Sequence, residues 1–460
     1  MHEPEELALL LEEVVALLNN RKYATIRKVL EVLNPADIAM LFQDLSESQV
    51  TVIFRLLPKE LAAETFVEME PDSQELLIRA FSDRELKEML DEMFVDDTVD
   101  IIEEMPANVV KRILKHTDPQ TRKEINQILS YPKDTAGSIM TTEYVDLKKD
   151  MTVEQAFARI RKNAVDKETV YNCYVTDKNR VLLGLVSVKD LLLHENTCII
   201  GDIMETNIIF AATLDDKEMV AQYFGKYDFL AIPVVDKENR LVGIVTFDDA
   251  MDVIEEETTE DIEKMAAMLP SDKPYMRTGV LETVRSRIFW LMLLMLSATL
   301  TSIVITRFEN ALAAYSVLIA FIPMLTGTGG NSGSQSSVAV IRGISLNEIA
   351  FSDLVKVVWK EIRVAVLCGV ILAGTNFVKI LLVDRLLLHN TEITVIIAAI
   401  ICLTLIGTVV CAKTVGCILP LLAEKVGLDP AVMASPFIST VVDVMSLVIY
   451  FTIASHILGL

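Results

Sequence analysis

The sequence is poor in the residues that build disulfide frameworks and transition-metal sites. Its 460 residues contain six cysteines and five histidines. The cysteines form no CxxC pair, and no cysteine lies near a histidine at the spacing of a zinc site. We therefore expect reduced, structural cysteines, no transition-metal cluster, and a cytosolic location for the first part of the chain.

Basic residues are scarce in the first 276 positions. Residues 277–460 hold 12 of the 42 basic and 10 of the 65 acidic residues, which leaves 30 and 55 for positions 1–276, a net charge of −25 there. Such a surface disfavours nucleic acid and anionic lipid and attracts cations. The N-terminus, MHEPEELALLLEEVV, is acidic and amphipathic, so we expect no signal peptide.

Residues 1–131 are predicted to form an acidic, all-α domain. Apolar residues recur at helical spacing, Pro and Asp separate the segments, and similar segment ends recur about 24 residues apart. This register predicts stacked helical hairpins that form a small superhelix. Asp96 and Asp100 would share one helix face, where they would either bridge a cation or form an N-cap with a solvated face.

Residues 132–199 and 200–252 are predicted to be two copies of one α/β module. Both copies contain an Ile-Met pair, a strand, a helix, and two strands joined by a turn; the strand pairs read VTDKNRVLLGLV and VVDKENRLVGIV. These shared elements resemble a tandem pair of CBS domains. That resemblance implies a regulatory module that commonly binds adenine nucleotides.

Each copy ends in Ser/Thr-x-x-Asp at a strand–helix junction, as Ser187 with Asp190 and Thr246 with Asp249. Such pairs could bond a ribose and orient phosphate at a helix N-terminus. They are also ordinary N-caps. ATP at Ser187 and Asp190 is therefore one of two interpretations.

Residues 253–277 are predicted to form an acidic connecting helix. The stretch FDDAMDVIEEETTEDIEKMAAM places Asp249, Asp252, Glu256 and Glu260 on one helix face. Oxygen ligands alone suit Mg²⁺ or Ca²⁺ better than softer metals. The alternative is a solvated linker that pairs with basic groups elsewhere.

Residues 278–460 are predicted to form an all-α membrane domain with five helices, at about 286–306, 312–341, 355–383, 393–422 and 431–456. The excess of Lys and Arg in alternate loops predicts that the C-terminus lies outside the cell membrane. Asp443 would lie inside the last helix, where a charge costs about 2.5–3.5 kcal/mol and commonly marks an ion path. Its alternative role is structural hydrogen bonding between helices.

The second predicted span contains PMLTGTGGNSGSQSS, residues 323–337. It has no Gly-Lys-Ser/Thr, so it is not a phosphate loop. Pro and four Gly at membrane depth predict an interrupted helix, with backbone carbonyls and the amides of Asn331 and Gln335 beside a cation path. The alternative role of the small residues is packing.

The full chain closely resembles the MgtE-type magnesium channels, through its domain order and the motifs GTGGNSGSQS and PFISTVVDV. The resemblance implies a homodimer in the cell membrane, with hydrated Mg²⁺ held at Asp443 in a pore. Gly330, Asn331, Ser334 and Gln335 would lie nearby. It also implies that cytosolic Mg²⁺ closes the pore by binding at regulatory carboxylates, which would be Glu64, Asp96, Asp100, Glu218, Asp228, Asp249, Asp252, Glu257, Glu260 and Asp261.

Two residues depart from the family pattern. Ser334 stands where some members have Asn, and Lys413 adds a cation to the fourth span. Lys413 would snorkel or pair with a carboxylate, and near the pore it would repel Mg²⁺.

Three other functional classes compete with a Mg²⁺ channel. A pore for Co²⁺, Mn²⁺ or Ca²⁺ fits the same ligand types. A nucleotide-sensing membrane regulator without conduction would use the CBS pair alone. An intramembrane enzyme needs a second positioned group beside Asp443, and no partner aspartate is found in the spans, so we expect no enzyme.

Overall fold

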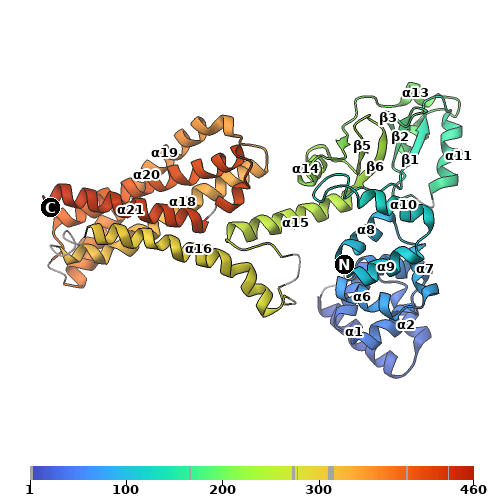
Figure 1. Ribbon diagram of the computed structural model, residues 1–460, viewed down its shortest axis with the longest axis horizontal. Coiled ribbons are helices and arrows are strands. Elements are labelled where there is room, and N and C mark those ends of the chain that lie inside the picture. Colours follow the sequence, from blue (N-terminus) through green and yellow to red (C-terminus); the bar gives the residue numbers. More distant parts are fainter. Residues whose placement is uncertain are drawn as a thin grey trace. The chain divides into compact units, whose positions relative to one another are not determined.

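The computed structural model describes residues 4–164, 167–271, 275–276, 278–308, 315–389, 392–433 and 435–459. The chain divides into two compact units, Met1–Ile254 (unit 1) and Glu255–Leu460 (unit 2). Figure 1 shows the elements of both units and labels those for which there is room. Arg277, one of the basic residues counted above, lies outside the described residues.

Unit 1 begins with short helices. They are α1 (Pro4–Asn19), α2 (Tyr23–Leu30), α3 (Pro35–Gln43), α4 (Glu47–Phe54), α5 (Lys59–Val67), α6 (Pro71–Ala80), α7 (Asp83–Leu90), α8 (Val95–Glu104), α9 (Ala107–His116) and α10 (Pro119–Ile128). Their starts are encoded locally. Pro opens α3, α6 and α10, and Ser46 and Ser82 form capping boxes at α4 and α7.

The predicted repeat is confirmed by the helix starts. Helices α3, α5, α7 and α9 begin at residues 35, 59, 83 and 107, and helices α4, α6, α8 and α10 begin at 47, 71, 95 and 119. Both series advance by 24 residues. Alternate helices pack on one another, α3 on α5, α5 on α7 and α7 on α9, which gives stacked helical pairs.

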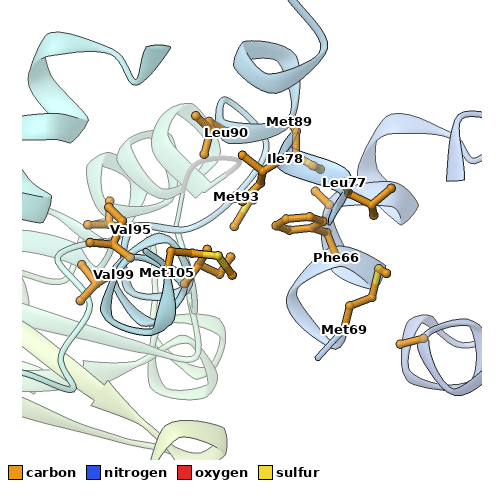
Figure 2. Packing of buried hydrophobic residues seen from close by; sticks show 14 of the residues in the cluster. Phe66, Met69, Leu77, Ile78, Met89, Leu90, Met93, Val95, Val99 and Met105 are labelled. Carbon is orange, nitrogen blue, oxygen red and sulfur yellow. The ribbon is translucent and has the colours of Figure 1, made fainter. Parts of the chain in front are cut away.

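Aromatic side chains form the centre of this stack. The ring of Phe54 lies 5.6–6.3 Å, centroid to centroid, from the rings of Phe42, Phe66 and Phe81. Figure 2 shows Phe66 in this core, and it also shows Val95 and Val99 with Met105 at the next part of the core. Val95 and Val99 are each 2% exposed, so packing fixes the first turn of α8.

The second part of unit 1 contains two small sheets with their helices. Their elements are β1 (Val145–Lys148), α11 (Val153–Asn163), β2 (Asn172–Thr176), β3 (Leu182–Ser187), α12 (Val188–Leu193), α13 (Ile200–Ile203), β4 (Ala211–Ala212), α14 (Lys217–Tyr227), β5 (Ala231–Val235), β6 (Leu241–Thr246) and the start of α15 (Phe247–Met265). In both sheets a parallel pair is followed by an antiparallel pair, in the orders β1-β2-β3 and β4-β5-β6. The predicted duplication is confirmed.

Helix α15 contains the end of unit 1 and the start of unit 2 in the sequence. It begins at Phe247, directly after β6, so the predicted border between residues 252 and 253 falls inside a continuous helix. The end of a CBS copy and the acidic segment are therefore one element.

Unit 2 is helical. Its elements after α15 are α16 (Val280–Arg307), η2 (Ser316–Phe321), α18 (Ile322–Ser345), η3 (Phe351–Asp353), α19 (Leu354–Lys379), the π-helical η4 (Ile380–Leu387), α20 (Val395–Lys425), η5 (Pro430–Met433) and α21 (Ser435–Leu458). Helix α20 packs on α18, α19 and α21, and α21 packs on α16 and α18. The core contains Leu318, Leu325 and Leu405, and the Tyr450 hydroxyl donates to the Leu318 carbonyl at 3.1 Å.

Within the described residues, four helical segments are long and apolar enough to cross a membrane: Val280–Arg307, Phe351–Leu387, Val395–Lys425 and Pro430–Leu458. These lengths and compositions indicate a multi-pass membrane protein. Helix α18 has 24 residues, but its Gly and Ser content keeps it out of this group.

The prediction of an interrupted second span is wrong. Helix α18 continues from Ile322 to Ser345 through the whole Gly-rich motif. Its small residues serve close packing instead: a methyl group at Gly333 would meet Ile438 at 2.7 Å, and one at Gly416 on α20 would overlap the Gly333 carbonyl. The neighbouring helices therefore hold the glycines in helical geometry despite their low propensity.

Candidate cation-binding sites

Three carboxylates from distant parts of unit 1 converge on one point. Asp96 lies in the first turn of α8, Glu143 precedes β1, and Glu168 precedes β2. One oxygen from each lies within 4.8 Å of the others. We call these residues the three-carboxylate group. Such an all-oxygen set has the chemistry that Mg²⁺ or Ca²⁺ prefers.

The three-carboxylate group lies in strongly negative surroundings. Burial raises the pKa of Asp96, and the nearby carboxylates of Asp249 and Asp97 raise it further. Burial, together with Asp97, Asp248 and other carboxylates, raises the pKa of Glu168 to about 8. The pKa of Asp97 rises to about 7, again through burial first and then through Asp249 and Asp248. The charges that act on these groups are all of one sign, so a cation would stabilise their ionised forms.

Some carboxylate oxygens in this region accept hydrogen bonds, and others have no donor. The Val95 amide donates to Glu143 Oε2 at 3.0 Å, and the Thr246 hydroxyl donates to Asp249 Oδ2 at 2.5 Å. In contrast, Asp96 Oδ1 and Glu168 Oε2 are buried and have no hydrogen-bond partner among the described residues. Buried carboxylate oxygens without a donor are costly, and a bound cation would satisfy them.

Only some of the residues predicted for this region lie at the three-carboxylate group. Asp96 belongs to the three-carboxylate group, and Asp249 acts on it electrostatically, although burial raises the pKa of Asp249 itself to about 6. Asp100 lies one turn further along α8 and is exposed. Sequence reasoning missed Glu143 and Glu168. They lie in irregular segments before strands, and no local spacing connects them to Asp96.

The remaining predicted regulatory residues of unit 1 lie on its surface. Glu64 on α5, Asp228 at the end of α14 and Asp252 on α15 are exposed, and Glu218 in the first turn of α14 is half-buried. Asp228 caps α14 in a left-handed conformation, with φ of 57°. The structure does not bring these residues into the three-carboxylate group, so their role as ligands stays a prediction.

A second acidic group in unit 2 already contains a basic side chain. Lys264 Nζ on α15 lies 2.6 Å from Glu260 Oε1 and 2.7 Å from Asp429 Oδ2, which precedes η5. The Ser345 hydroxyl donates to Asp261 Oδ2 at 3.4 Å, and Met265 packs on Ile341 and Ala431.

The electrostatics of this second group depend on Lys264. Burial alone would lower the pKa of the Lys264 ammonium, but Asp429 and Glu260 more than offset this and raise it. Burial also raises the pKa of Asp261, and Asp429 adds to that effect. Glu257, also predicted as a ligand, is half-buried one turn before Asp261 on the same helix. The group therefore combines predicted cation ligands with an internal cation.

Asp443 lies half-buried on α21, beside the close contact between α21 and α18. A methyl group at Gly329 of α18 would meet Val442 and Ser446 at 2.9 Å, and one at Gly330 would meet Ser439 at 3.1 Å. The glycines thus let the motif approach the turns on either side of Asp443. Asn331 and Gln335, four residues apart, are exposed on one face of α18, and Ser334 is half-buried.

Both proposed nucleotide-binding pairs lie at helix starts. The Ser187 hydroxyl donates to Asp190 Oδ2 at 2.5 Å and accepts from the Asp190 amide at 3.1 Å, which makes a complete N-cap. The Thr246 hydroxyl donates to Asp249 Oδ2 at 2.5 Å, and the Thr246 amide donates to the same oxygen at 3.4 Å. Both pairs therefore have a structural role at a helix start, and nucleotide binding stays a proposal.

Family models match most of the chain. Residues 33–134 match the MgtE intracellular N domain, residues 136–195 and 200–256 match the CBS domain, and residues 322–453 match a divalent cation transporter model. The magnesium transporter MgtE of Thermus thermophilus is 35% identical over 458 residues, which are 99% of each chain. This chain belongs to the MgtE family. The magnesium transporter MgtE of Bacillus subtilis is 32% identical and covers 97% of each chain.

Solved structures of an MgtE channel and of a magnesium transporter agree with the fold of the first half. The cytosolic domain of the Mg²⁺ channel MgtE in complex with ATP is 35% identical, with a TM-score of 0.51, and covers 53% of this chain and 99% of that one. The soluble part of a magnesium transporter is 30% identical, with the same TM-score of 0.51, and covers 55% and 99%. The predicted helical domain and CBS pair are thereby confirmed.

Proposed function

We propose that this protein is a Mg²⁺ channel of the MgtE family that cytosolic Mg²⁺ closes. The observation that carries the proposal is Asp443, a carboxylate inside an apolar α21, which the glycine face of α18 packs against. The names of the MgtE relatives support Mg²⁺ as the transported ion. Mg²⁺ loses its water reluctantly, so a site with one or two carboxylates and retained waters suits its passage.

We further propose that two copies assemble so that both Asp443 side chains face one pore. The half-buried Asp443 and the exposed Asn331 and Gln335 support this, because each keeps polar atoms at the surface of a single copy. Two carboxylates would supply about two negative charges for a divalent ion. The excess of basic residues in alternate loops supports a cytosolic N-terminal half and an outside C-terminus.

Closure would depend on cations that bind to the carboxylates of unit 1 and α15. The three-carboxylate group fits such an ion, because two of its buried oxygens have no donor. Without a cation, the like charges disfavour the compact arrangement. Bound Mg²⁺ favours it, and this differential affinity shifts the population toward the closed state.

A nucleotide at the CBS pair is a second proposal, which the ATP complex of a 35% identical relative supports. The residues would be Ser187 and Asp190 at the start of α12. We expect ATP to bind in calorimetry and Asp190→Asn to weaken the binding at least about tenfold through loss of a ribose acceptor. Unchanged binding in that variant would move the site elsewhere.

Flux into liposomes tests the proposed channel. Purified protein is reconstituted, and Mg²⁺ entry is followed with an internal indicator at low and high Mg²⁺ on the side of unit 1. We expect flux that falls as this Mg²⁺ rises. Flux of Ca²⁺, Co²⁺ or Mn²⁺ in preference to Mg²⁺ would contradict the assigned ion, and ATP binding without any flux would favour a non-conducting regulator.

A further inference from the structure

A buried ionic network joins three membrane helices of unit 2. Lys413 of α20 is 6% exposed, and its Nζ donates to the Ser336 hydroxyl of α18 at 3.2 Å. That hydroxyl donates to Glu361 Oε2 of α19 at 2.6 Å, and Lys413 Nζ lies 4.0 Å from the same carboxylate oxygen. The sequence left open whether Lys413 snorkels or pairs. It pairs, and its partner is Glu361.

The ion pair with Glu361 offsets the free-energy cost of burying the charge of Lys413 inside unit 2. The side chains of Lys413 and Glu361 are only 7% and 15% exposed, so neither reaches water freely. Removing one member of a buried pair leaves an uncompensated charge, which is far more costly than removing both. Ser336 lies between the two charges and ties them to the Gly-rich motif.

The network adjoins the segment assigned to ion passage. Ala412, the residue before Lys413, belongs to one apolar cluster with Ile438 and Val442. Val442 in turn precedes Asp443. The carbonyl of Ala412 and the Val442 side chain would both contact a methyl group at Gly333, one turn before Ser336. Lys413 and Asp443 are therefore each one residue away from the same packing contact.

We propose that Lys413 and Glu361 form an internal charge pair that positions the Gly-rich segment of α18 and keeps the potential beside Asp443 close to neutral. This inference rests on the proposed function of Asp443. The ammonium of Lys413 would otherwise repel the permeating cation, and the carboxylate of Glu361 would otherwise capture it. Lys413 and Glu361 are positioning residues, since each acts on the ion through the arrangement around Asp443.

The sign of each charge gives the test. Glu361→Gln leaves the ammonium uncompensated, so the Mg²⁺ concentration at half-maximal flux should rise. Lys413→Met leaves the carboxylate uncompensated, so that concentration should fall, with a slower maximal flux because the ion leaves late. A unit charge about 10 Å from an ion changes its binding about tenfold at an effective dielectric constant of about 20. We therefore expect shifts of about tenfold in opposite directions.

The double variant Glu361→Gln with Lys413→Met should return the half-maximal concentration to within about threefold of the wild type. The matched control is the ion pair of Asp353 and Lys356 near the start of α19, whose charged atoms lie 2.8 Å apart and whose side chains are 33% and 84% exposed. Asp353→Asn and Lys356→Met should leave the half-maximal concentration unchanged, because solvent screens them.

Shifts in the same direction, with a double variant no better than the worse single variant, would overturn the inference and indicate a packing role only. If a single variant fails to reach the membrane, the double variant decides: recovery of flux supports the pair, and its loss contradicts it. Absence of flux in the wild type would instead overturn the proposed channel.

Discussion

Asp96 in unit 1 and Glu361 in unit 2 are both carboxylates withdrawn from water, yet their surroundings differ. Glu361 faces a lysine that belongs to the same fold, through Ser336. Asp96 faces Glu143 and Glu168, and the charges that act on it are carboxylates. A carboxylate with an internal cation stays compensated at every ion concentration, whereas one without it responds to the ions around it.

The same distinction separates the ends of α15. Its first turn carries Asp248 and Asp249, which add negative charge around Asp97 and Glu168. Its last turns carry Lys264, which bridges Glu260 and Asp429. Acidic content alone therefore does not identify an ion sensor. In the proposed channel, the sensor would be the three-carboxylate group, where the charges that act on Asp96 are carboxylates.

The largest expected effect concerns the carboxylate at the proposed pore. Asp443→Ala should lower Mg²⁺ flux by at least about a hundredfold, since a unit charge about 4 Å from a cation contributes several kcal/mol even at an effective dielectric constant of about 20. Asp353→Asn, a half-buried aspartate of the same unit that pairs with the exposed Lys356, is the control. Near-normal flux in Asp443→Ala would contradict the pore assignment.

The next effect is loss of inhibition. Neutralising Asp249, Asp252 and Glu257 together, each to its amide, should leave the channel open at Mg²⁺ concentrations that close the wild type, because the cation loses its ligands. Flux in liposomes against Mg²⁺ on the side of unit 1 measures this. Unchanged inhibition would show that these carboxylates are an ordinary solvated surface.

A more specific variant targets two residues of the three-carboxylate group, Asp96 and Glu168. Asp96→Asn with Glu168→Gln keeps the shape of the three-carboxylate group and removes two of its charges. Inhibition by Mg²⁺ should weaken at least about tenfold, as expected when one or two hydrogen-bonded or charged ligands are lost. Glu85→Gln on α7, whose carboxylate pairs with Arg55 at 2.8 Å, is a control that removes a compensated charge. Equal inhibition in the double variant would exclude the group as a ligand site.

The stability of the region around α8 should also depend on pH. The folded-state pKa values of Asp97 and Glu168 are about 7 and about 8, well above their ordinary values, so the folded form holds more protons than the unfolded form between about pH 5 and 8. Without divalent cations, local stability around α8 should therefore fall as the pH rises through this window.

Hydrogen exchange of the α8 amides, expressed as protection factors, measures this trend. Mg²⁺ binds the ionised carboxylates, so it should increase protection more at pH 8 than at pH 6. Protection that is independent of pH and Mg²⁺ would indicate that the group holds no cation.

The smallest effect is expected where the cation is internal. Lys264→Met removes the ion pairs to Glu260 and Asp429 and leaves two carboxylates facing each other. Closure should then need more Mg²⁺, by about two- to fivefold, in keeping with a partly exposed pair. Lys356→Met, which breaks the ion pair with Asp353, is the control. Closure at lower Mg²⁺ in Lys264→Met would show that the lysine competes with the ion for these carboxylates.

Much of the fold could be predicted because its signals are local. Pro and Ser mark several helix starts, the helix starts recur with a 24-residue period, and the strand pairs of the two copies have similar sequences. Asp443 is conspicuous in the sequence because it places a charge in an apolar helix, and its role as an ion ligand stays a prediction. Glu143 and Glu168 could not be found, since folding alone brings them to Asp96 across 47 and 72 positions.

Two features of unit 2 were hidden for related reasons. Glycines in a span predict a break from propensity alone, but Ile438 and Gly416 close on α18 and keep it helical. Glu361 stands between Lys360 and Arg363 in the sequence, where it reads as part of a charged helix end. Only the packing of α18, α19 and α20 shows that it points to Lys413.

We propose that cations from solution occupy the acidic surface of unit 1 and close a Mg²⁺ pathway in unit 2. The decisive experiment is Mg²⁺ flux into liposomes, recorded against Mg²⁺ on the side of unit 1 for the wild type and for Asp96→Asn with Glu168→Gln. We expect flux that falls with Mg²⁺ in the wild type and stays high in the variant. Flux that ignores Mg²⁺ in the wild type, or falls equally in both proteins, would contradict it.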